Sequence, residues 1–177
     1  TDDYYEEQIH TLRPEAFLRL HRNEWATGSE EFIPIELWDK ATVLEGPILY
    51  EKDSPYLDYP VSIGVDVGTK HDASAVVGVY YDFHRGKVGL AFHRIWEPFK
   101  GEVLDLESTV EEYLRMGWGW PGVNVISVRY DPHQFARSMV TLRNLGMPME
   151  EFSQHRDNMT KASQNLYELI RYNVLEV

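Results

Sequence analysis

The sequence predicts an α/β fold in which a mixed β-sheet, an antiparallel meander plus parallel strands, is flanked by helices. Three observations predict it. Apolar runs rich in valine and tyrosine lie between residues 61 and 96, separated only by short polar turns. A later apolar run, residues 123–130, is followed by helical spacing, and strand–helix alternation is typical of α/β folds. Residues 1–60 are instead acidic and interrupted by prolines.

The first three strands are expected to form the meander. Residues 61–67 are expected to form a buried strand that ends in a polar turn, residues 68–72. A second strand is expected from 73 to 81, and a turn at 82–86 leads into a third strand, 87–96. Because strands joined by short turns pair antiparallel, these three should lie side by side in chain order.

The second half of the chain supplies the helices and the parallel strands. Apolar residues recur at helical spacing from Asp105 to Met116, and glycines and tryptophans at 117–122 end that helix. The remaining expected elements are a strand at 123–130, a helix from Pro132 through Leu145, a short strand near 149–152, a helix at 158–172 and a strand-like end at 174–177.

The acidic charge is unevenly distributed. Residues 1–60 carry 14 acids and 5 bases, whereas residues 61–177 carry 15 acids and 12 bases, so most of the net charge of −12 lies in the first segment. That segment is acidic and proline-rich, so we expect that it cannot fold alone. The second segment is near neutral, so a polyanionic partner is not excluded. Binding to such a partner should be weak and salt-sensitive.

Composition excludes several classes of protein. The 177 residues contain no cysteine, which rules out disulfides, thiolate nucleophiles and cysteine-based zinc sites. The seven histidines lack the His-x-x-x-His spacing of zinc hydrolases, and no Gly-x-x-x-x-Gly-Lys-Ser/Thr phosphate loop occurs. No apolar run approaches the roughly 20 residues of a membrane span. We expect a soluble intracellular protein without a membrane partner.

Two aspartates, Asp66 and Asp131, end hydrophobic strands and are followed by turns. If the strands are adjacent and parallel, both carboxylates emerge at the carboxyl edge of the sheet, where α/β proteins place ligands. Such a pair needs a positive charge between its members, and hard oxygen ligands favour Mg²⁺ or Mn²⁺. The alternative is structural, because aspartate often caps turns and helices, and Asp131 before Pro132 could be the N-cap of the next helix.

The turn after the first strand has further candidates. Lys70 and His71 could contact a phosphate backbone, although exposed charges in a turn are more often only solvated. The Asp-x-Gly-Thr pattern of residues 66–69 also resembles the phosphate loop of the actin, Hsp70 and sugar-kinase group. That group needs a longer chain with a second such loop, and we see none here.

Taken together, these motifs resemble the C-terminal nuclease domain of the large terminase subunit of tailed bacteriophages. The resemblance rests on Ile63-Gly64-Val65-Asp66-Val67-Gly68 with Asp72 six residues after Asp66, on the hairpin, and on Val128-Arg129-Tyr130-Asp131-Pro132. It extends to residues 17–25, which are similar to the link that leaves the ATPase domain. Residues 1–60 would then be an acidic linker at the end of that ATPase region, and residues 61–177 the nuclease domain.

The resemblance implies a ribonuclease H-like fold that cuts double-stranded concatemeric DNA by two-metal hydrolysis during genome packaging. Asp66 and Asp131 match the family's first two catalytic, metal-binding aspartates, and Asp72 matches a further acid near the metal ions, Mg²⁺ or Mn²⁺. Lys70, His71 and Arg137 are candidate DNA contacts. The implied partners are DNA, the small terminase subunit and the portal, in the host cell cytoplasm.

The resemblance also implies that the domain is incomplete at its C-terminus. The family's third metal-binding aspartate lies in a helix beyond the last strand, after Val177, so this fragment is expected to hold metal weakly or not at all and to be inactive. Two other functions stay open. The chain could be a noncatalytic module of the same fold that docks DNA or the packaging motor, or an actin-like nucleotide-binding fragment.

Overall fold

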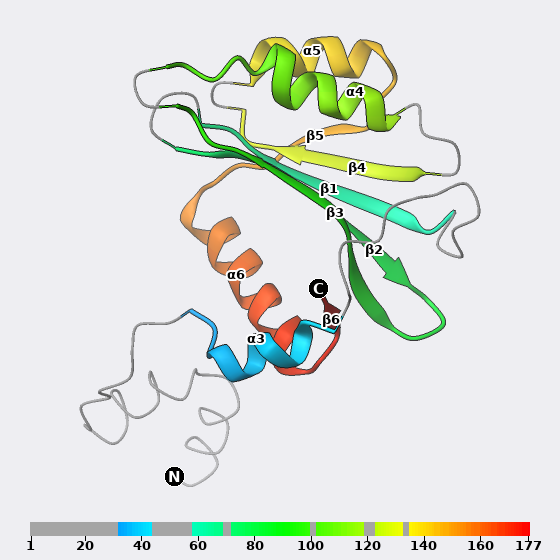
Figure 1. The fold of residues 1–177 in the computed structure, drawn as a ribbon. Coiled ribbons are helices and arrows are strands. Elements are labelled where there is room, and N and C mark those ends of the chain that lie inside the picture. Colours follow the sequence, from blue (N-terminus) through cyan, green and yellow to red (C-terminus); the bar gives the residue numbers. More distant parts are fainter. Residues whose placement is uncertain (1–31, 44–57, 69–71, 100–101, 119–122, 133–134) are drawn as a thin grey trace, which may run out of the picture. The chain divides into compact units, whose positions relative to one another are not determined.

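The computed structural model describes residues 32–43, 58–68, 72–99, 102–118, 123–132 and 135–177. The chain divides into two compact units, residues 1–34 and 35–177. The elements of the second unit are, in chain order (Figure 1), α3 (Ile35–Ala41), β1 (Pro60–Asp66), β2 (Ser74–Asp82), β3 (Lys87–Trp96), η2 (Glu107–Glu111), α4 (Glu112–Trp118), β4 (Asn124–Tyr130), α5 (Ala136–Asn144), β5 (Met149–Glu151), α6 (Arg156–Arg171) and β6 (Leu175–Glu176).

The strands form one six-stranded sheet in the order β5-β4-β1-β2-β3-β6. β1, β2 and β3 pair antiparallel as neighbours, which confirms the predicted meander. β4 pairs parallel with β1 and with β5, and β6 pairs parallel with β3. The predicted mixed sheet is therefore confirmed.

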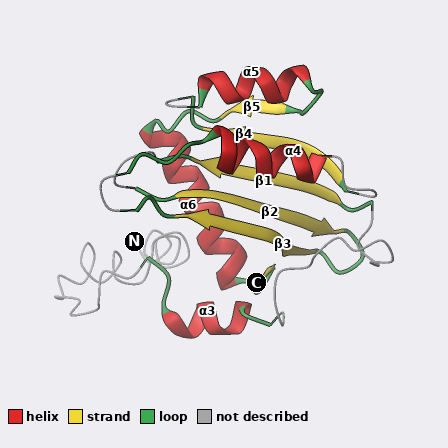
Figure 2. Ribbon diagram, turned by 45° about the horizontal axis from the view of Figure 1, so that its top comes forward, coloured by secondary structure: helices red, strands yellow, loops and turns green. Residues whose placement is uncertain are grey.

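The two faces of the sheet differ. The helices α4 and α5 cover one face, and α6 lies on the other side (Figures 1 and 2). Along β1, Val61, Ile63 and Val65 are buried in the core, whereas Gly64 and Asp66 are exposed, as the two-residue period of a strand requires. We call the face under α4 and α5 the helix face. The other, which carries the exposed residues Gly64, Asp66, Val77 and Arg129, is the open face.

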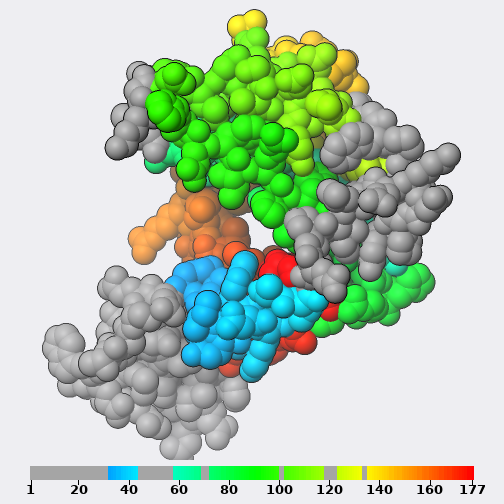
Figure 3. Space-filling model, in the orientation of Figure 1, coloured from blue at the N-terminus to red at the C-terminus, as the bar shows by residue number. Residues whose placement is uncertain are grey.

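Helix α6 does not seal the open face. It is amphipathic, but Ile170 is its single buried residue. A hollow is visible between α6 and the sheet in the space-filling view (Figure 3). The residues of the open face near the carboxyl end of β1 are consequently accessible to solvent.

The helix expected after β3 begins as a π-helix, η2, and continues as α4. Its predicted apolar positions Val110 and Leu114 are buried in the core. Asp105 precedes the first turn, where its carboxylate accepts hydrogen bonds from the Ser108 hydroxyl at 2.8 Å and the Glu107 N–H at 3.1 Å. These bonds lower the pKa of Asp105, as expected for an acid at a helix start.

A short helix before the sheet, α3, was not expected from the sequence. It packs against α6, and the residues that follow it contact the C-terminus. The Val43 N–H donates to the Val177 carbonyl at 3.1 Å, and the Val177 N–H donates to the Ala41 carbonyl at 2.8 Å. Residues 35–43 therefore belong to the same unit as the sheet, and a functional boundary at residue 60 stays a prediction.

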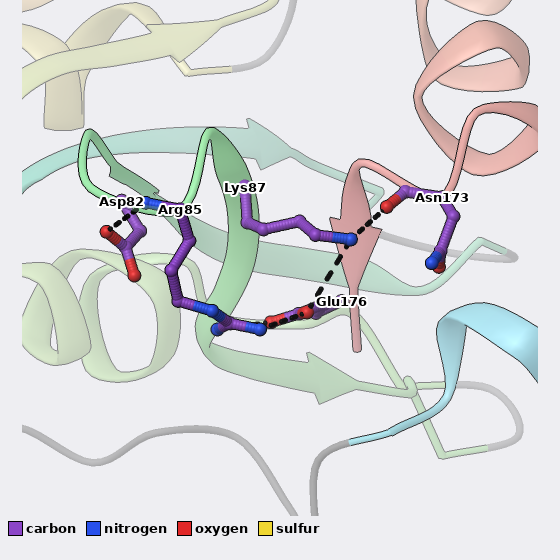
Figure 4. Close-up of polar contacts among 5 residues, drawn as sticks. All are labelled: Asp82, Arg85, Lys87, Asn173 and Glu176. Carbon is purple, nitrogen blue, oxygen red and sulfur yellow. Dashed lines mark hydrogen bonds and ion pairs between the residues drawn. The ribbon is translucent and has the colours of Figure 1, made fainter.

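The edge strand β6 is held to the β2–β3 hairpin by a buried carboxylate (Figure 4). Glu176, only 6% exposed, accepts two hydrogen bonds from the Arg85 guanidinium at 2.8 and 2.6 Å. The Lys87 ammonium lies 3.8 Å from the same carboxylate and also donates to the Asn173 carbonyl. The bond to Glu176 raises the pKa of Arg85. This contact joins residues that are far apart in the chain.

Replacing Glu176 with glutamine should destabilise the fold by about 1–2 kcal/mol, since a charge-assisted bidentate pair would be lost. Arg85 is half exposed and can regain water, so the full cost of a buried unpaired charge is not expected. Chemical denaturation measures the loss. Glu150→Gln is the matched control, because its pair with Arg129 is exposed and should contribute less than about 0.5 kcal/mol. Equal losses in the two variants would contradict the prediction.

Candidate functional site

Asp66 and Asp131 lie at the same edge of the sheet. β1 and β4 are adjacent and parallel, and the last residues paired between them are Val65 and Tyr130. Asp66 and Asp131 are the next residue on each strand. Both aspartates therefore lie at the carboxyl edge, in neighbouring positions, as the sequence predicted for adjacent parallel strands.

The two carboxylates differ in exposure but belong to the same side of the sheet. Asp66 is exposed on the open face, and its backbone still pairs with Ala75 of β2. Asp131, the first residue after β4, is half-buried. It lies two residues after the exposed Arg129, so the strand period places it on the open face as well.

Asp131 is not the N-cap of the next helix, so that part of the structural explanation is wrong. α5 begins at Ala136, and its N-cap is Phe135, which makes no side-chain capping bond. The predicted helix start at Pro132 was too early by four residues. Residues 133–134 between the strand and the helix lie outside the described part of the chain.

Among the described residues, Gly68 and Ser74 join the two ends of the turn after β1. The buried Ser74 hydroxyl donates a hydrogen bond to the Gly68 carbonyl at 2.8 Å. The same hydroxyl accepts one from the Gly68 N–H, whose nitrogen lies 3.1 Å away. These two bonds tie the start of β2 to the end of β1. The Asp66 carboxylate takes part in neither of these two bonds.

Asp72 lies close to Gly68, just after the end of β1. A Cβ on Gly68 would lie 2.5 Å from the Asp72 carbonyl oxygen and 2.7 Å from its Cβ, so only glycine fits there. This approach requires the glycine of the Asp-x-Gly pattern. The Asp72 side chain is exposed. Lys70 and His71, on the same turn, lie outside the described residues.

Arg137 lies on the first turn of α5, where its guanidinium pairs with the Glu107 carboxylate at 2.7 Å. The pair is exposed and links α5 to η2. Its proposed contact with DNA stays a prediction.

Two glutamates of β5 were missed by the sequence reasoning. Glu150 and Glu151 pair in register with Arg129 and Tyr130. The Tyr130 hydroxyl donates to Glu151 at 3.4 Å, and burial, followed by the Glu151 charge, raises the pKa of Tyr130. Arg129 Nε lies 3.3 Å from Glu150 Oε2. Because β5 has only three residues, its pairing partner could not be read from a local pattern.

The donor chemistry of the aspartate pair fits Mg²⁺ or Mn²⁺. Such ions are commonly held by one or two carboxylates, with water and substrate phosphate oxygens completing the shell. Within the described ranges, no group of three or more His, Cys, Asp or Glu side chains is arranged to hold a metal ion. The described site thus offers a pair of carboxylates, with Asp72 on the adjoining turn. None of the described helices is long and apolar enough to span a membrane.

No protein-family model matches the sequence, and no curated protein is significantly similar to it. The structure is similar to the large terminase of bacteriophage HK97, with a TM-score of 0.63 and 16% identity over 98% of this chain and 40% of that one. The large terminase of a thermophilic bacteriophage gives 0.65 and 13% identity, covering 99% and 40%. The large terminase nuclease of thermophilic phage G20c, with bound magnesium, gives 0.52 and 16% identity, covering 80% and 71%.

The chain has the fold of a large-terminase nuclease. The predicted ribonuclease H-like fold class is confirmed by this similarity and by the mixed sheet. The chain spans about 40% of the length of the whole terminases that it resembles. Within this fold, Asp66 and Asp131 at the carboxyl edge of β1 and β4 form the candidate site.

Proposed function

We propose that this chain contains the metal-dependent endonuclease domain of a viral DNA-packaging terminase. It hydrolyses phosphodiester bonds of double-stranded concatemeric DNA by a two-metal mechanism. The observation that carries the proposal is the register of β1 and β4, which places Asp66 and Asp131 at neighbouring positions of one sheet edge. The terminase-nuclease fold supports the same activity, and the similar nuclease of phage G20c binds magnesium.

In this proposal Asp66 and Asp131 hold the ions and Asp72 supports them from the adjoining turn. When bound, Mg²⁺ or Mn²⁺ activates a water molecule and stabilises the leaving oxygen of the phosphodiester. The aspartates supply negative charge that concentrates divalent cations at the edge. Without cations the same charge repels the DNA phosphates, so binding of the scissile phosphate depends on metal. The exposure of Asp66 on the open face lets a duplex approach.

The packaging role extends beyond this chain. Double-stranded DNA is the substrate, and the small terminase subunit and the portal are the partners in the host cell cytoplasm. The support is the likeness to whole large terminases, of which this chain spans about 40%. A motor domain elsewhere in such a protein would deliver the DNA, which suits a domain of weak intrinsic affinity.

Cleavage of supercoiled plasmid, assayed on the longest form of the protein that contains this chain, should require Mn²⁺ or Mg²⁺ and should stop in EDTA, since the bound ions supply the activated water and stabilise the leaving oxygen. Gel electrophoresis measures nicked and linear products, and titration calorimetry measures Mn²⁺ binding. Calcium is the control ion: it occupies oxygen sites without supporting the chemistry. Absence of both Mn²⁺ binding and metal-dependent cleavage would contradict the proposal.

A noncatalytic docking module is the second candidate, and one observation favours it. The described residues provide no group of three acids or histidines that could hold an ion. A docking module should bind duplex DNA with an affinity that neither Mg²⁺ nor Asp66→Asn changes, and it should leave the DNA uncut. Calorimetry with and without Mg²⁺ therefore separates the two functions.

A further inference from the structure

Arg129 lies beside the two aspartates on the open face of the sheet. Gly64 and Arg129 are paired across β1 and β4, two residues before Asp66 and Asp131. Side chains two residues apart on a strand share a face and are separated by about 7 Å. The Arg129 guanidinium therefore projects from the same face as the two aspartates, one row away from them.

The surface around Arg129 is open. Its side chain is 61% exposed, and its neighbour Gly64 contributes no side chain. A Cβ built on Gly64 would meet no closer atom than the Val77 carbonyl oxygen, at 4.0 Å. A phosphate group could thus reach the guanidinium without displacing a side chain of β1.

Arg129 is held by one exposed acid. Its Nε lies 3.3 Å from Glu150 Oε2, and the Glu150 side chain is 52% exposed. An exposed ion pair of this kind contributes little stability, so another anion can take the place of the carboxylate. Two other described cations are placed differently: Arg137 pairs with Glu107, and Arg94 lies over the rings of Trp96 and Tyr113.

We propose that Arg129 binds the phosphodiester backbone of DNA beside the aspartate pair, and that Glu150 competes with the DNA for it. Guanidinium binds phosphate through two parallel hydrogen bonds, and bidentate recognition suits a backbone that must be held in one position. The inference rests on the proposed nuclease function, since it places the phosphate next to the one that is cut. Arg129 acts as a DNA-binding residue that positions the substrate.

The test measures the affinity of the full chain for a fluorescein-labelled 20-base-pair duplex by fluorescence anisotropy, in Ca²⁺ and at several salt concentrations. Arg129→Gln should weaken binding about tenfold and reduce the slope of log affinity against log salt by about 1, because one phosphate contact is lost. Arg129→Lys should keep most of the slope. Glu150→Gln should strengthen binding about twofold, because the competing carboxylate is removed.

Arg115→Gln is the matched control. Arg115 is exposed on α4, which covers the helix face, so the variant removes the same charge from the opposite side of the sheet. It should change the affinity less than twofold. Thermal unfolding of each variant checks that the fold is kept. The proposal would be overturned if Arg129→Gln bound DNA with wild-type affinity, or if Arg115→Gln lost as much affinity as Arg129→Gln. It would also be overturned if Glu150→Gln bound more weakly than the wild type, or if the wild type did not bind at all.

Kinetics separate this inference from the proposed function. If both hold, Arg129→Gln should raise KM with little change in kcat, whereas Asp66→Asn should lower kcat. Undiminished cleavage by Asp66→Asn together with weakened binding by Arg129→Gln would remove the nuclease assignment and keep the DNA contact. Lowered cleavage by Asp66→Asn together with unchanged binding by Arg129→Gln would exclude the Arg129 contact and keep the nuclease assignment.

Discussion

Asp66→Asn and Asp131→Asn are each expected to lower metal-dependent DNA cleavage at least about a hundredfold, which corresponds to about 3 kcal/mol of transition-state stabilisation. Asparagine keeps the shape of aspartate but removes the charge that holds a divalent cation. Because both carboxylates belong to one site, either change should disable it. Plasmid cleavage in Mn²⁺ measures the rates, and calorimetry should show weaker Mn²⁺ binding in both variants.

Asp58→Asn is the matched control for this prediction. Asp58 is exposed and precedes β1 at the opposite end of the sheet, and its positive φ of 74° is one that asparagine also adopts. Its cleavage rate should equal that of the wild type. Asp72→Asn should lose activity less severely, about tenfold, because Asp72 lies on the adjoining turn rather than at a strand end. Undiminished cleavage by both the Asp66 and the Asp131 variant would contradict the assignment.

Gly89→Ala is expected to destabilise the fold by about 2–3 kcal/mol, the largest stability effect that we predict. Gly89 on β3 is paired with Tyr80 on β2, whose buried ring lies across the glycine. A Cβ at Gly89 would lie 2.2 Å from Tyr80 Cζ and 2.3 Å from its hydroxyl oxygen. Since this ring is part of the packed core, it cannot move aside without disturbing its neighbours. Denaturant unfolding measures the loss.

Gly64→Ala is the control substitution within the same sheet. A Cβ at Gly64 would meet only the Val77 carbonyl oxygen, at 4.0 Å, so the variant should be neutral or slightly more stable. A double-mutant cycle with Tyr80→Leu tests the cause: the combined loss should be smaller than the sum of the single losses. Additive losses, or equal effects of alanine at Gly64 and Gly89, would exclude the ring clash as the explanation.

The strands of the meander could be predicted from the sequence because their signals are local. Apolar runs form the strands, and short polar turns separate them. The hairpin turn is an example. The Asp82 carboxylate accepts bonds from the N–H groups of His84 and Arg85, and Gly86 adopts the positive φ of 64° that glycine permits. All the determinants of this turn lie within five residues.

Elements whose stability comes from distant contacts were predicted poorly. α3 is only seven residues long, and it is stabilised by α6 and by the backbone bonds between residues 41–43 and Val177. By contrast, the strand-like end predicted at 174–177 is confirmed as β6, and only its pairing with β3 and the bond between Glu176 and the hairpin could not be read from the sequence. The start of α5 was placed too early because Pro132 is typical of a first helical turn, yet the helix begins after Phe135.

For the candidate site, the sequence by itself determined that Asp66 and Asp131 end hydrophobic strands, since that property depends only on neighbouring residues. Only the tertiary structure decided that the two strands are adjacent, parallel and in a register that brings the aspartates to one edge. It also decided which side of the sheet stays open and that Arg129 shares it with the aspartates. The physical reason is that parallel pairing joins strands almost 60 residues apart in the chain, through packing that no local pattern encodes.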